Sequence, residues 1–487
     1  MTPPQPDILI FLSDQHNASV TGYAGDTIIH TPHLDELAAN GCQFKQAYTP
    51  CPLCVPARVA FLSGQLPSQT CAFTNASSVP GDHATWLHGL ASIGYDTVLC
   101  GRMHFVGEDQ RHGFTERIFP DFTPQYWQTG KKFNQDLGDY AGTLDANRTT
   151  LKAKGGGGNS PVTAYDKAVI KAALDFLSKP RSRPLCLVIG TYGPHNPYVC
   201  DLDLYQKYRP QVQLPARFGA NAPEDTPLTR QRSLKLSEGE ILSARAAYYG
   251  MVETLDRQVG QVSQAWDESL AKSGRKGWFI YTSDHGDHLG ERNTLAKQTL
   301  FEASVRIPLL IRGDGIPQGA RIDPPVSLLD LGVTLNHASS APLPPGQAGQ
   351  DLAPFFSDDP PSGTSRVLSE YMDHDPAHHQ PVLCRMLRDG DYKLITHADH
   401  PEWDQLFNLK TDSGETDNRV TRERPLYQHL HQQAWAQGNP DQTVATYLEK
   451  KAHTQILCAY GDRIGPPEHE VWTSERGRYV LPQCDLT

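Results

Sequence analysis

The sequence predicts an α/β fold with a large, mostly parallel or mixed sheet flanked by helices, and a smaller antiparallel α+β unit at the C-terminal end. The first observation is a set of four short aliphatic or β-branched runs, at residues 8–12, 97–100, 185–189 and 278–282, each of which ends in polar residues. Continuous apolar runs are typical of strands buried on both faces of a parallel sheet. The other two observations are helical periodicity between these runs and a change of composition after residue 335.

Two helices between the runs are predicted from their periodicity and boundary residues. In residues 31–40, Pro32 is placed to open a helix and Gly41 to end it. In residues 163–178, apolar residues recur at helical spacing. We expect these helices to cover the sheet, and we assign no chemistry to them.

A second unit is predicted after two connections rich in proline and glycine, at residues 341–346 and 358–363. The strand-like runs that follow are residues 366–371, 382–387 and 392–396, with a hairpin turn at residues 388–391. We therefore predict a catalytic α/β domain over residues 1–365 and an antiparallel α+β subdomain with a tail over residues 366–487.

The composition fits a globular enzyme that acts on a small molecule. The chain has 487 residues, of which 38% are hydrophobic, and its net charge of −11 disfavours nucleic acid or an anionic membrane as a partner. No apolar run approaches the roughly 18 residues that cross a bilayer, and the N-terminal residues do not resemble a secretion signal. The ten cysteines are scattered, as expected of reduced thiols. We expect a cytoplasmic protein that binds neither nucleic acid nor a membrane.

Polar side chains follow each of the four predicted strands. They are Asp14 and Gln15 after the first run, Arg102 and His104 after the second, His195 after the third, and Asp284 and His285 after the fourth. Ligands of open α/β sheets bind beyond the carboxyl ends of the strands. We therefore expect these side chains to meet in one site.

The stretch from Cys51 to Gly64 allows two interpretations of its cysteines. Cys51 and Cys54 have the spacing of a redox or zinc pair, but a zinc site needs two further ligands at matching spacing, and none follows. In the second interpretation only Cys54 acts. It would begin a helix that runs to Gly64, with Pro56 in the first turn, so that main-chain N–H groups face an anion at Cys54.

The second interpretation matches a known family. Cys54-Val-Pro-Ala-Arg58, followed by Leu62-Ser-Gly64, resembles the Cys-x-Pro-x-Arg signature of type I sulfatases in the alkaline phosphatase superfamily. Other stretches resemble that family in the same order: Gly101 to Gly107, Gly193 to Pro197, Ser283 to Glu291, Lys297 with Phe301-Glu302, and Ser369 to Tyr371. The resemblance covers nearly the whole chain, and the nearest pattern is that of choline sulfatases and their cytoplasmic relatives.

The resemblance implies a nucleophile and a metal site. In this family an installing enzyme oxidises the motif cysteine to formylglycine, and the matching residue is Cys54, so Cys51 is a bystander. Asp14, Gln15, Asp284 and His285 would hold a divalent metal together with the modified Cys54. Many sulfatases have Asp where this chain has Gln15 and Asn where it has His285. The resemblance therefore implies Mn, Ca or Mg as the metal. The loss of one carboxylate at Gln15 and the gain of an imidazole at His285 weaken the case for Ca.

The resemblance also implies how other residues act on a small-molecule sulfate ester. Arg58 would hold the hydrated aldehyde, while Arg102 and Lys297 would hold the sulfate oxygens, with Arg102 standing where the family usually has lysine. His195 would protonate the leaving alcohol. His104 would take the proton of the second hydroxyl when sulfate leaves.

The alcohol portion of the substrate is less well defined by the sequence. Asn75 matches an asparagine of choline sulfatases and is a candidate to bind a substrate oxygen, although a turn role is equally compatible. Tyr126 and Trp127 are candidates for a quaternary-ammonium pocket, or for ordinary core aromatics. The resemblance to the family also implies a homo-oligomer, either a dimer or a tetramer.

Three functions stay open at this level. The first is metal-dependent hydrolysis of a sulfate ester. The second keeps the fold and nucleophile but acts on a phosphonate monoester or phosphodiester; it is disfavoured because Arg102 and His104 stand where that relative has Tyr and Thr. The third is a metal-stabilised binding protein with an unmodified Cys54, which leaves the combination of acid, base and nucleophile unexplained.

Overall fold

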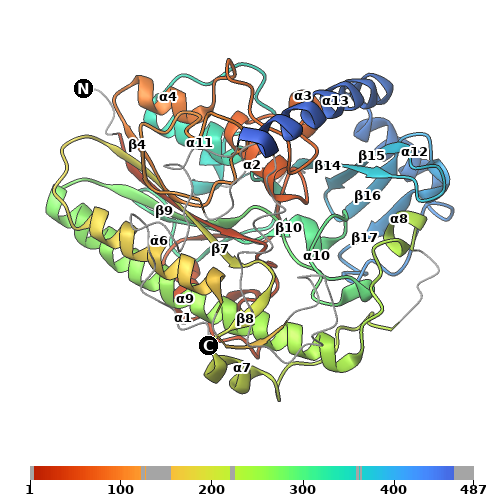
Figure 1. The fold of residues 1–487 in the computed structure, drawn as a ribbon, viewed down its shortest axis with the longest axis horizontal. Coiled ribbons are helices and arrows are strands. Elements are labelled where there is room, and N and C mark those ends of the chain that lie inside the picture. Colours follow the sequence, from red (N-terminus) through yellow and green to blue (C-terminus); the bar gives the residue numbers. More distant parts are fainter. Residues whose placement is uncertain are drawn as a thin grey trace.

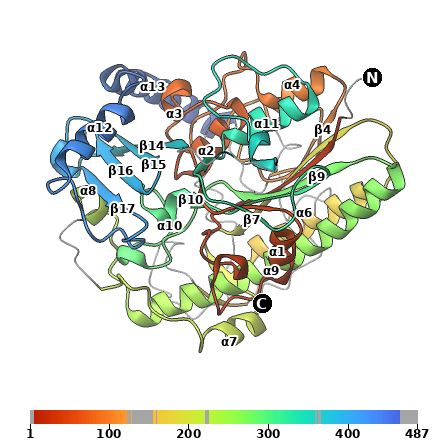
Figure 2. The ribbon, with the colours of Figure 1, turned by 180° about the vertical axis from the view of Figure 1, so that it is seen from behind.

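A computed structural model of the chain describes residues 5–121, 127, 155–158, 160–219, 225–357, 361 and 365–464. Tyr126 and the tail from residue 475 lie outside these ranges. Figures 1 and 2 show the molecule from opposite sides, with a large sheet between helices and a smaller sheet beside it.

The large sheet has eight strands in the order β12-β2-β11-β9-β1-β7-β4-β5. Their bounds are β1 Asp7–Asp14, β2 Cys42–Phe44, β4 Asp96–Gly101, β5 Glu116–Phe119, β7 Leu185–Pro194, β9 Gly277–Ser283, β11 Leu309–Gly313 and β12 Ala320–Ile322. β11 runs antiparallel to β9 and to β2, and the other neighbouring pairs run parallel, so the sheet is mixed.

The four strands predicted from apolar runs lie side by side in the middle of this sheet, as β9, β1, β7 and β4, and all run parallel. Every residue of β1, β7 and β9 is buried, as expected of strands covered on both faces. Their carboxyl ends therefore lie at one edge, where the polar residues were expected to meet.

Alternate residues of β1 pack against two layers of helices, because successive side chains of a strand point to opposite faces. Leu9 and Phe11 share a core with the first layer, and Ile10 and Leu12 share a core with the second. The first layer contains α1 (Pro32–Ala39), α6 (Pro161–Leu177) and α9 (Glu238–Ser273), and the second contains α2 (Cys54–Ser63), α4 (Trp86–Ser92) and α11 (Asp330–Ser339). In Figure 1 the first layer lies below the sheet and the second above it.

The two helices predicted from periodicity are α1 and α6, and their bounds agree with the prediction to within two residues at each end. The 36-residue helix α9 was not predicted. Its ends nevertheless follow the sequence. At the start, the Ser237 side chain accepts from the Glu240 N–H, and the Glu240 carboxylate accepts from the Ser237 N–H. At the other end, Gly274 stops the helix with a φ of 65°.

A separate antiparallel sheet follows, in the order β14-β15-β16-β17. Its strands are β14 Arg366–His374, β15 Pro381–Asp389, β16 Tyr392–His397 and β17 Gln405–Asn408, and α12 (Arg424–Ala434) and α13 (Pro440–Ile464) pack against it. The first three strands were predicted and β17 was not. The predicted α/β fold with a large mixed sheet and a smaller antiparallel sheet is confirmed. The domain boundary after residue 365 stays a prediction, although β14 begins at Arg366.

The small sheet is attached directly to the segment that precedes Cys54. The Glu370 N–H on β14 donates to the Pro50 carbonyl at 2.8 Å, and the Glu370 carboxylate accepts from the Ser68 N–H at 2.7 Å. The buried Arg385 side chain on β15 pairs with the same carboxylate at 2.8 Å. Residues 50–68 are therefore held between the two sheets.

The remaining elements are short. β3 (Ala47–Tyr48), β10 (Arg306–Ile307) and β13 (Val326–Ser327) form a three-stranded sheet, and β6 (Gly155–Gly157) pairs with β8 (Tyr198–Cys200). The short α-helices are α3 (Pro67–Thr70), α7 (Leu202–Tyr208), α8 (Pro227–Arg230) and α10 (Glu302–Val305). The 3₁₀ turns are η1 (Gly22–Ala24), η3 (Glu291–Asn293), η4 (Ala353–Phe356) and η5 (Pro401–Trp403). Within the described ranges, none of the helices has both the length and the apolar character needed to cross a membrane.

Candidate active site

Helix α2 brings Cys54 to the edge where the parallel strands end. The helix begins at Cys54, carries Pro56 in its first turn, and ends at Gly64 with a φ of 69°, as the sequence predicts. The Val55 N–H is one of the N-terminal donors without a partner in the helix, and it donates to Asn75 Oδ1 at 3.1 Å. Asn75 therefore lies beside the start of the helix and secures it.

The two cysteines of the Cys51–Cys54 pair have different surroundings. Cys51 is fully buried among apolar side chains such as Leu53 and Tyr371, and both cysteines are free thiols. Cys54, which is only 1% exposed, faces polar groups instead. Burial and the neighbouring Asp14 carboxylate raise the pKa of the Cys54 thiol to about 11, so the unmodified side chain is a neutral thiol at pH 7.

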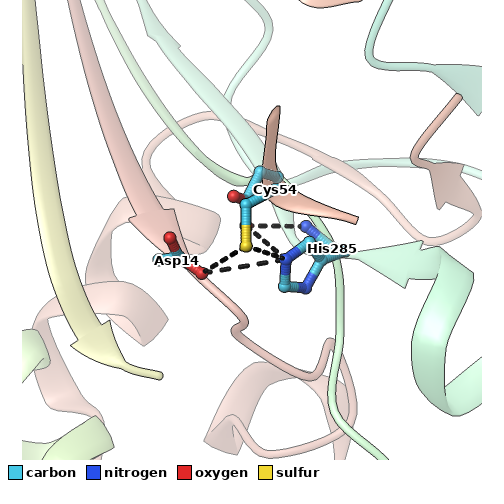
Figure 3. Close-up of side chains that lie close together, drawn as sticks. Asp14, Cys54 and His285 are labelled. Carbon is cyan, nitrogen blue, oxygen red and sulfur yellow. Dashed lines mark hydrogen bonds and ion pairs between the residues drawn. The ribbon is translucent and has the colours of Figure 1, made fainter. Parts of the chain in front are cut away.

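Four side chains from three parts of the chain, including Cys54, form a cluster. Asp14, Cys54, Asp284 and His285 each offer one ligand atom, and these atoms lie within 4.8 Å of one another. Figure 3 shows three of them: His285 Nε2 lies 3.2 Å from Cys54 Sγ and 3.7 Å from Asp14 Oδ1, while Cys54 Sγ lies 3.8 Å from Asp14 Oδ1. The carboxyl ends of β1 and β9 and the start of α2 thus form one cluster.

The imidazole of His285 is oriented by the main chain. Its Nδ1 lies 3.1 Å from the Gly286 carbonyl oxygen, which can only accept, so Nδ1 carries the proton and the lone pair of Nε2 faces the cluster. Burial lowers the pKa of His285, although Asp284 opposes the effect, and the ring is therefore neutral at pH 7. A neutral imidazole with its lone pair turned inward is the form that binds metals.

Two buried arginines hold the outer oxygens of the carboxylates. Arg58 donates from Nε to Asp284 Oδ2 at 2.9 Å and from Nη2 to Asp14 Oδ2 at 3.1 Å, and Arg102 Nε donates to the same Asp14 oxygen at 2.7 Å. Burial alone would raise the pKa of Asp14, but Arg102 and the other nearby cations hold it well below its usual value. Asp14 is therefore ionised, and its Oδ1 is turned to Cys54 and His285.

This donor set fits a divalent cation. Two carboxylates suit a hard cation such as Mg²⁺, Mn²⁺ or Ca²⁺, and an imidazole nitrogen adds a borderline donor that Mn²⁺ accepts more readily than Ca²⁺. The predicted ligands Asp14, Asp284, His285 and Cys54 are thus brought together.

The fifth predicted ligand, Gln15, lies beside Lys297. Gln15 Oε1 accepts from Lys297 Nζ at 2.5 Å, and the Gln15 N–H donates to Asp284 Oδ1 at 3.1 Å. Lys297 Nζ also lies 2.6 Å from His195 Nε2. The predicted oxyanion-binding lysine and the predicted acid are therefore in direct contact.

That contact fixes the tautomer of His195. Its Nδ1 lies 2.6 Å from the Asn196 carbonyl oxygen, so Nδ1 donates and Nε2 accepts from the Lys297 ammonium. Burial and the positive charge of Lys297 lower the pKa of His195 well below its usual value. The imidazole is neutral, and the hydrogen bond of the pair runs from Lys297 Nζ to His195 Nε2.

His104 contacts the same Arg102 guanidinium that binds Asp14. Its Nδ1 lies 2.8 Å from Arg102 Nη2, and a guanidinium only donates, so the proton of the neutral ring is on Nε2. Burial and Arg102 lower the pKa of His104 well below its usual value. The lone pair of His104 Nδ1 is therefore occupied by the Arg102 guanidinium.

Four residues in the same region have a left-handed backbone conformation. Gln15, His104, Ala296 and Gln298 all have positive φ values, of 69°, 60°, 66° and 80°. Residues other than glycine adopt this conformation at a cost, and such residues gather at active sites when the surrounding structure holds them. Two of the four are predicted site residues, and the other two flank Lys297.

Two acidic residues of the site were missed by the sequence reasoning. Asp121 accepts from the N–H groups of Met103 at 3.1 Å and His104 at 2.7 Å, and it holds the segment that carries Arg102 and His104. Asp287 accepts from Gln15 Nε2 at 2.5 Å. Asp287 lies within the Ser283 to Glu291 stretch that resembles the family, so the sequence contained a signal for it. The sequence around Asp121 contains no such motif.

Comparisons with known proteins agree with this geometry. The sulfatase family model matches residues 6–339, and a model described as N-sulphoglucosamine sulphohydrolase, C-terminal, matches residues 290–439. A choline-sulfatase of Rhizobium meliloti (strain 1021) is 32% identical over 458 residues, which cover 87% of this chain and 84% of that protein.

Solved structures share the fold over most of the chain. A phosphonate monoester hydrolase from Silicibacter pomeroyi has 22% identity and a TM-score of 0.71, covering 88% of this chain and 94% of the other. A protein in complex with its substrate D-glucosamine-2-N,6-O-disulfate has 19% identity and a TM-score of 0.73, covering 90% and 99%. Since the family model spans most of the chain and a relative at 32% identity spans nearly all of it, this protein belongs to the sulfatase family and is a sulfuric ester hydrolase.

Proposed function

We propose that this protein hydrolyses the sulfate ester of a small molecule to an alcohol and sulfate, with a formylglycine made from Cys54 and a divalent metal. The observation that carries the proposal is the buried cluster of Asp14, Cys54, Asp284 and His285 at the start of α2. When present, the metal and the formylglycine supply an activated hydroxyl as nucleophile. Gln15 completes the proposed ligand set.

The sulfate group would be held by fixed cations. Arg58 bridges Asp14 and Asp284 and would hold residue 54. Arg102 donates to Asp14 and Lys297 donates to Gln15, and both cations would bind the sulfate oxygens. Charge on a transferring group is stabilised by donors that are already in position. Asn75 secures the helix start and would reach the substrate only through its amide nitrogen.

Two histidines would handle the protons. The Lys297–His195 pair would protonate the departing alcohol, and the contact of 2.6 Å supports shared transfer. His104 would accept the proton of the second hydroxyl at Nδ1 as sulfate leaves, when Arg102 no longer donates to it.

The relatives suggest which compounds to try first. The choline-sulfatase relative makes choline sulfate the first candidate, and the disulfated glucosamine bound by a protein of the same fold makes a sugar sulfate the second. The phosphonate monoester hydrolase fold supports testing a phosphonate monoester as the alternative substrate. A cytoplasmic location, a dimer or tetramer, and maturation by a formylglycine-installing enzyme are further parts of the proposal.

The test joins the chemical state of residue 54 to a substrate panel. In active protein we expect the tryptic peptide with Cys54 to have the mass of formylglycine, and metal-reconstituted enzyme to hydrolyse sulfate esters faster than phosphate or phosphonate esters. A fully unaltered thiol in protein purified to constant specific activity would contradict the formylglycine. Faster turnover of the phosphonate would favour the alternative function.

His104→Ala is expected to separate the two halves of the reaction. Because no group would take the second proton, about one equivalent of alcohol should be released per active site, followed by turnover slowed by about 10²–10⁴-fold. Rapid-quench kinetics with an activated aryl sulfate would measure this burst. His337→Ala, on an exposed histidine paired with Asp351, serves as the control that should turn over like the parent. Slow turnover without a burst would assign His104 to the first half instead.

A further inference from the structure

The side-chain amide of Gln15 lies between two groups that fix its direction. Lys297 Nζ, which can only donate, lies 2.5 Å from Gln15 Oε1. Asp287 Oδ2 lies 2.5 Å from Gln15 Nε2, and Asn196 Oδ1 is a second acceptor on that side at 3.4 Å. The amide oxygen therefore faces Lys297, and the NH₂ group faces Asp287, while the main-chain N–H of Gln15 binds Asp284 of the proposed metal site at 3.1 Å.

Asp287 is fully buried, and donors occupy both of its oxygens. Oδ1 accepts from the N–H groups of Leu289 and Ala296, each at 2.9 Å, and Oδ2 accepts from Gln15 Nε2 and from the Tyr198 hydroxyl at 2.8 Å. The two main-chain donors cannot change their role. A carboxylate at position 15 would have no proton to offer Asp287 and would meet a second negative charge inside the protein.

We propose that Asp287 is a positioning residue that turns the oxygen of Gln15 toward the metal, and that it is the reason position 15 carries an amide rather than a carboxylate. The inference rests on the proposed function, because it takes the metal site as given. With an amide at position 15, the carboxylates that face the metal are Asp14 and Asp284. The Asp287 carboxylate binds the NH₂ group of Gln15 and does not face the metal.

Asp287→Asn makes a distinct prediction. The new amide has one acceptor and one donor end, and the N–H groups of Leu289 and Ala296 will hold its oxygen on their side. Its NH₂ group then faces Gln15, and the Gln15 amide must turn its oxygen to it and its NH₂ to the metal. We expect the affinity for Mn²⁺, measured by calorimetric titration, to fall by about 10–100-fold.

The matched second variant is Gln15→Glu in the Asp287→Asn background. The glutamate accepts from the NH₂ group of residue 287 and still presents an oxygen to the metal. We expect the affinity for Mn²⁺ to return to within about fivefold of the parent, and the affinity for Ca²⁺ relative to Mn²⁺ to rise, since a carboxylate oxygen replaces an amide oxygen. A merely structural role for Asp287 would give no such rescue.

All titrations use full-length protein with the same measured state of residue 54, and thermal unfolding confirms that each variant is folded. Asp330→Asn is the control: this buried carboxylate also accepts main-chain N–H groups, from Ser327 and Gln350, but lies on α11. Its affinity for Mn²⁺ should match the parent. An unchanged affinity for Mn²⁺ in Asp287→Asn would overturn the proposal that Asp287 orients Gln15. A double variant that binds Mn²⁺ no more tightly than Asp287→Asn would also overturn it. A parent that binds neither Mn²⁺ nor Ca²⁺ would overturn both the pairing and the metal of the proposed function.

Discussion

Replacing Asp284 with alanine is expected to remove bound metal and sulfatase activity together. Asp284 contributes one of the two negative charges of the cluster, and its two oxygens organise the site: Oδ2 pairs with Arg58, and Oδ1 accepts from the N–H groups of Gln15 and His285. We expect turnover to fall by at least about a thousand-fold. Metal content, measured by atomic emission, should fall below about a tenth of the parent value.

The same substitution leaves a buried guanidinium with one fewer partner, which costs about 3–5 kcal/mol in the free energy of unfolding. Asp284→Asn separates this effect from metal loss, because it keeps the size of the side chain and an oxygen for one donor. His285→Asn is the contrasting variant: it replaces a neutral donor by an amide oxygen, so we expect a loss within about tenfold and a shift toward Ca²⁺. Metal content in folded Asp284→Ala equal to that of the parent would contradict the ligand assignment.

Loss of His195 is expected to affect esters according to their leaving group. His195→Ala should slow the hydrolysis of unactivated alkyl sulfates by about 10²–10⁴-fold, because their alkoxide needs a proton as it departs. Activated aryl sulfates, whose oxygen leaves with little assistance, should lose less than about tenfold. Steady-state kinetics over a series of leaving groups would show this as a steeper dependence of rate on the pKa of the alcohol.

Lys297→Ala provides the comparison for this prediction. Lys297 contacts both Gln15 and His195, so its removal should weaken sulfate binding as well as protonation and slow both classes of ester. Equal losses on alkyl and aryl sulfates in His195→Ala would mean that His195 binds the sulfate rather than assisting the leaving group.

Much of the fold was accessible from the sequence because the central strands are buried on both faces. Continuous apolar runs at β1, β4, β7 and β9 identified the strands, and the polar residues after them identified the edge at which the site forms. The ends of α2 followed from Cys54-Val-Pro and Gly64. These features depend on neighbouring residues in the chain, so local pattern is sufficient to find them.

The features that the sequence did not reveal depend on contacts between distant segments. The Lys297–His195 contact joins residues on different loops, and it fixes the tautomer of His195. The bonds from Asp121 and Asp287 are of the same kind. Spacing along the chain identifies candidate groups, but the direction of a hydrogen bond is set only when the segments meet.

The burial of Cys54 has a consequence for the order of events during synthesis. Cys54 is 1% exposed in the folded protein, and Glu370 on β14 binds the segment before it, so the side chain is out of reach of another enzyme once the small sheet has docked. For the proposed oxidation, the nascent chain is the accessible substrate. At roughly 5–20 residues per second, the ribosome needs on the order of tens of seconds to pass from residue 54 to residue 370. The installing enzyme of the proposed function would therefore have to act before the small sheet docks, and slower elongation should raise the fraction of modified protein.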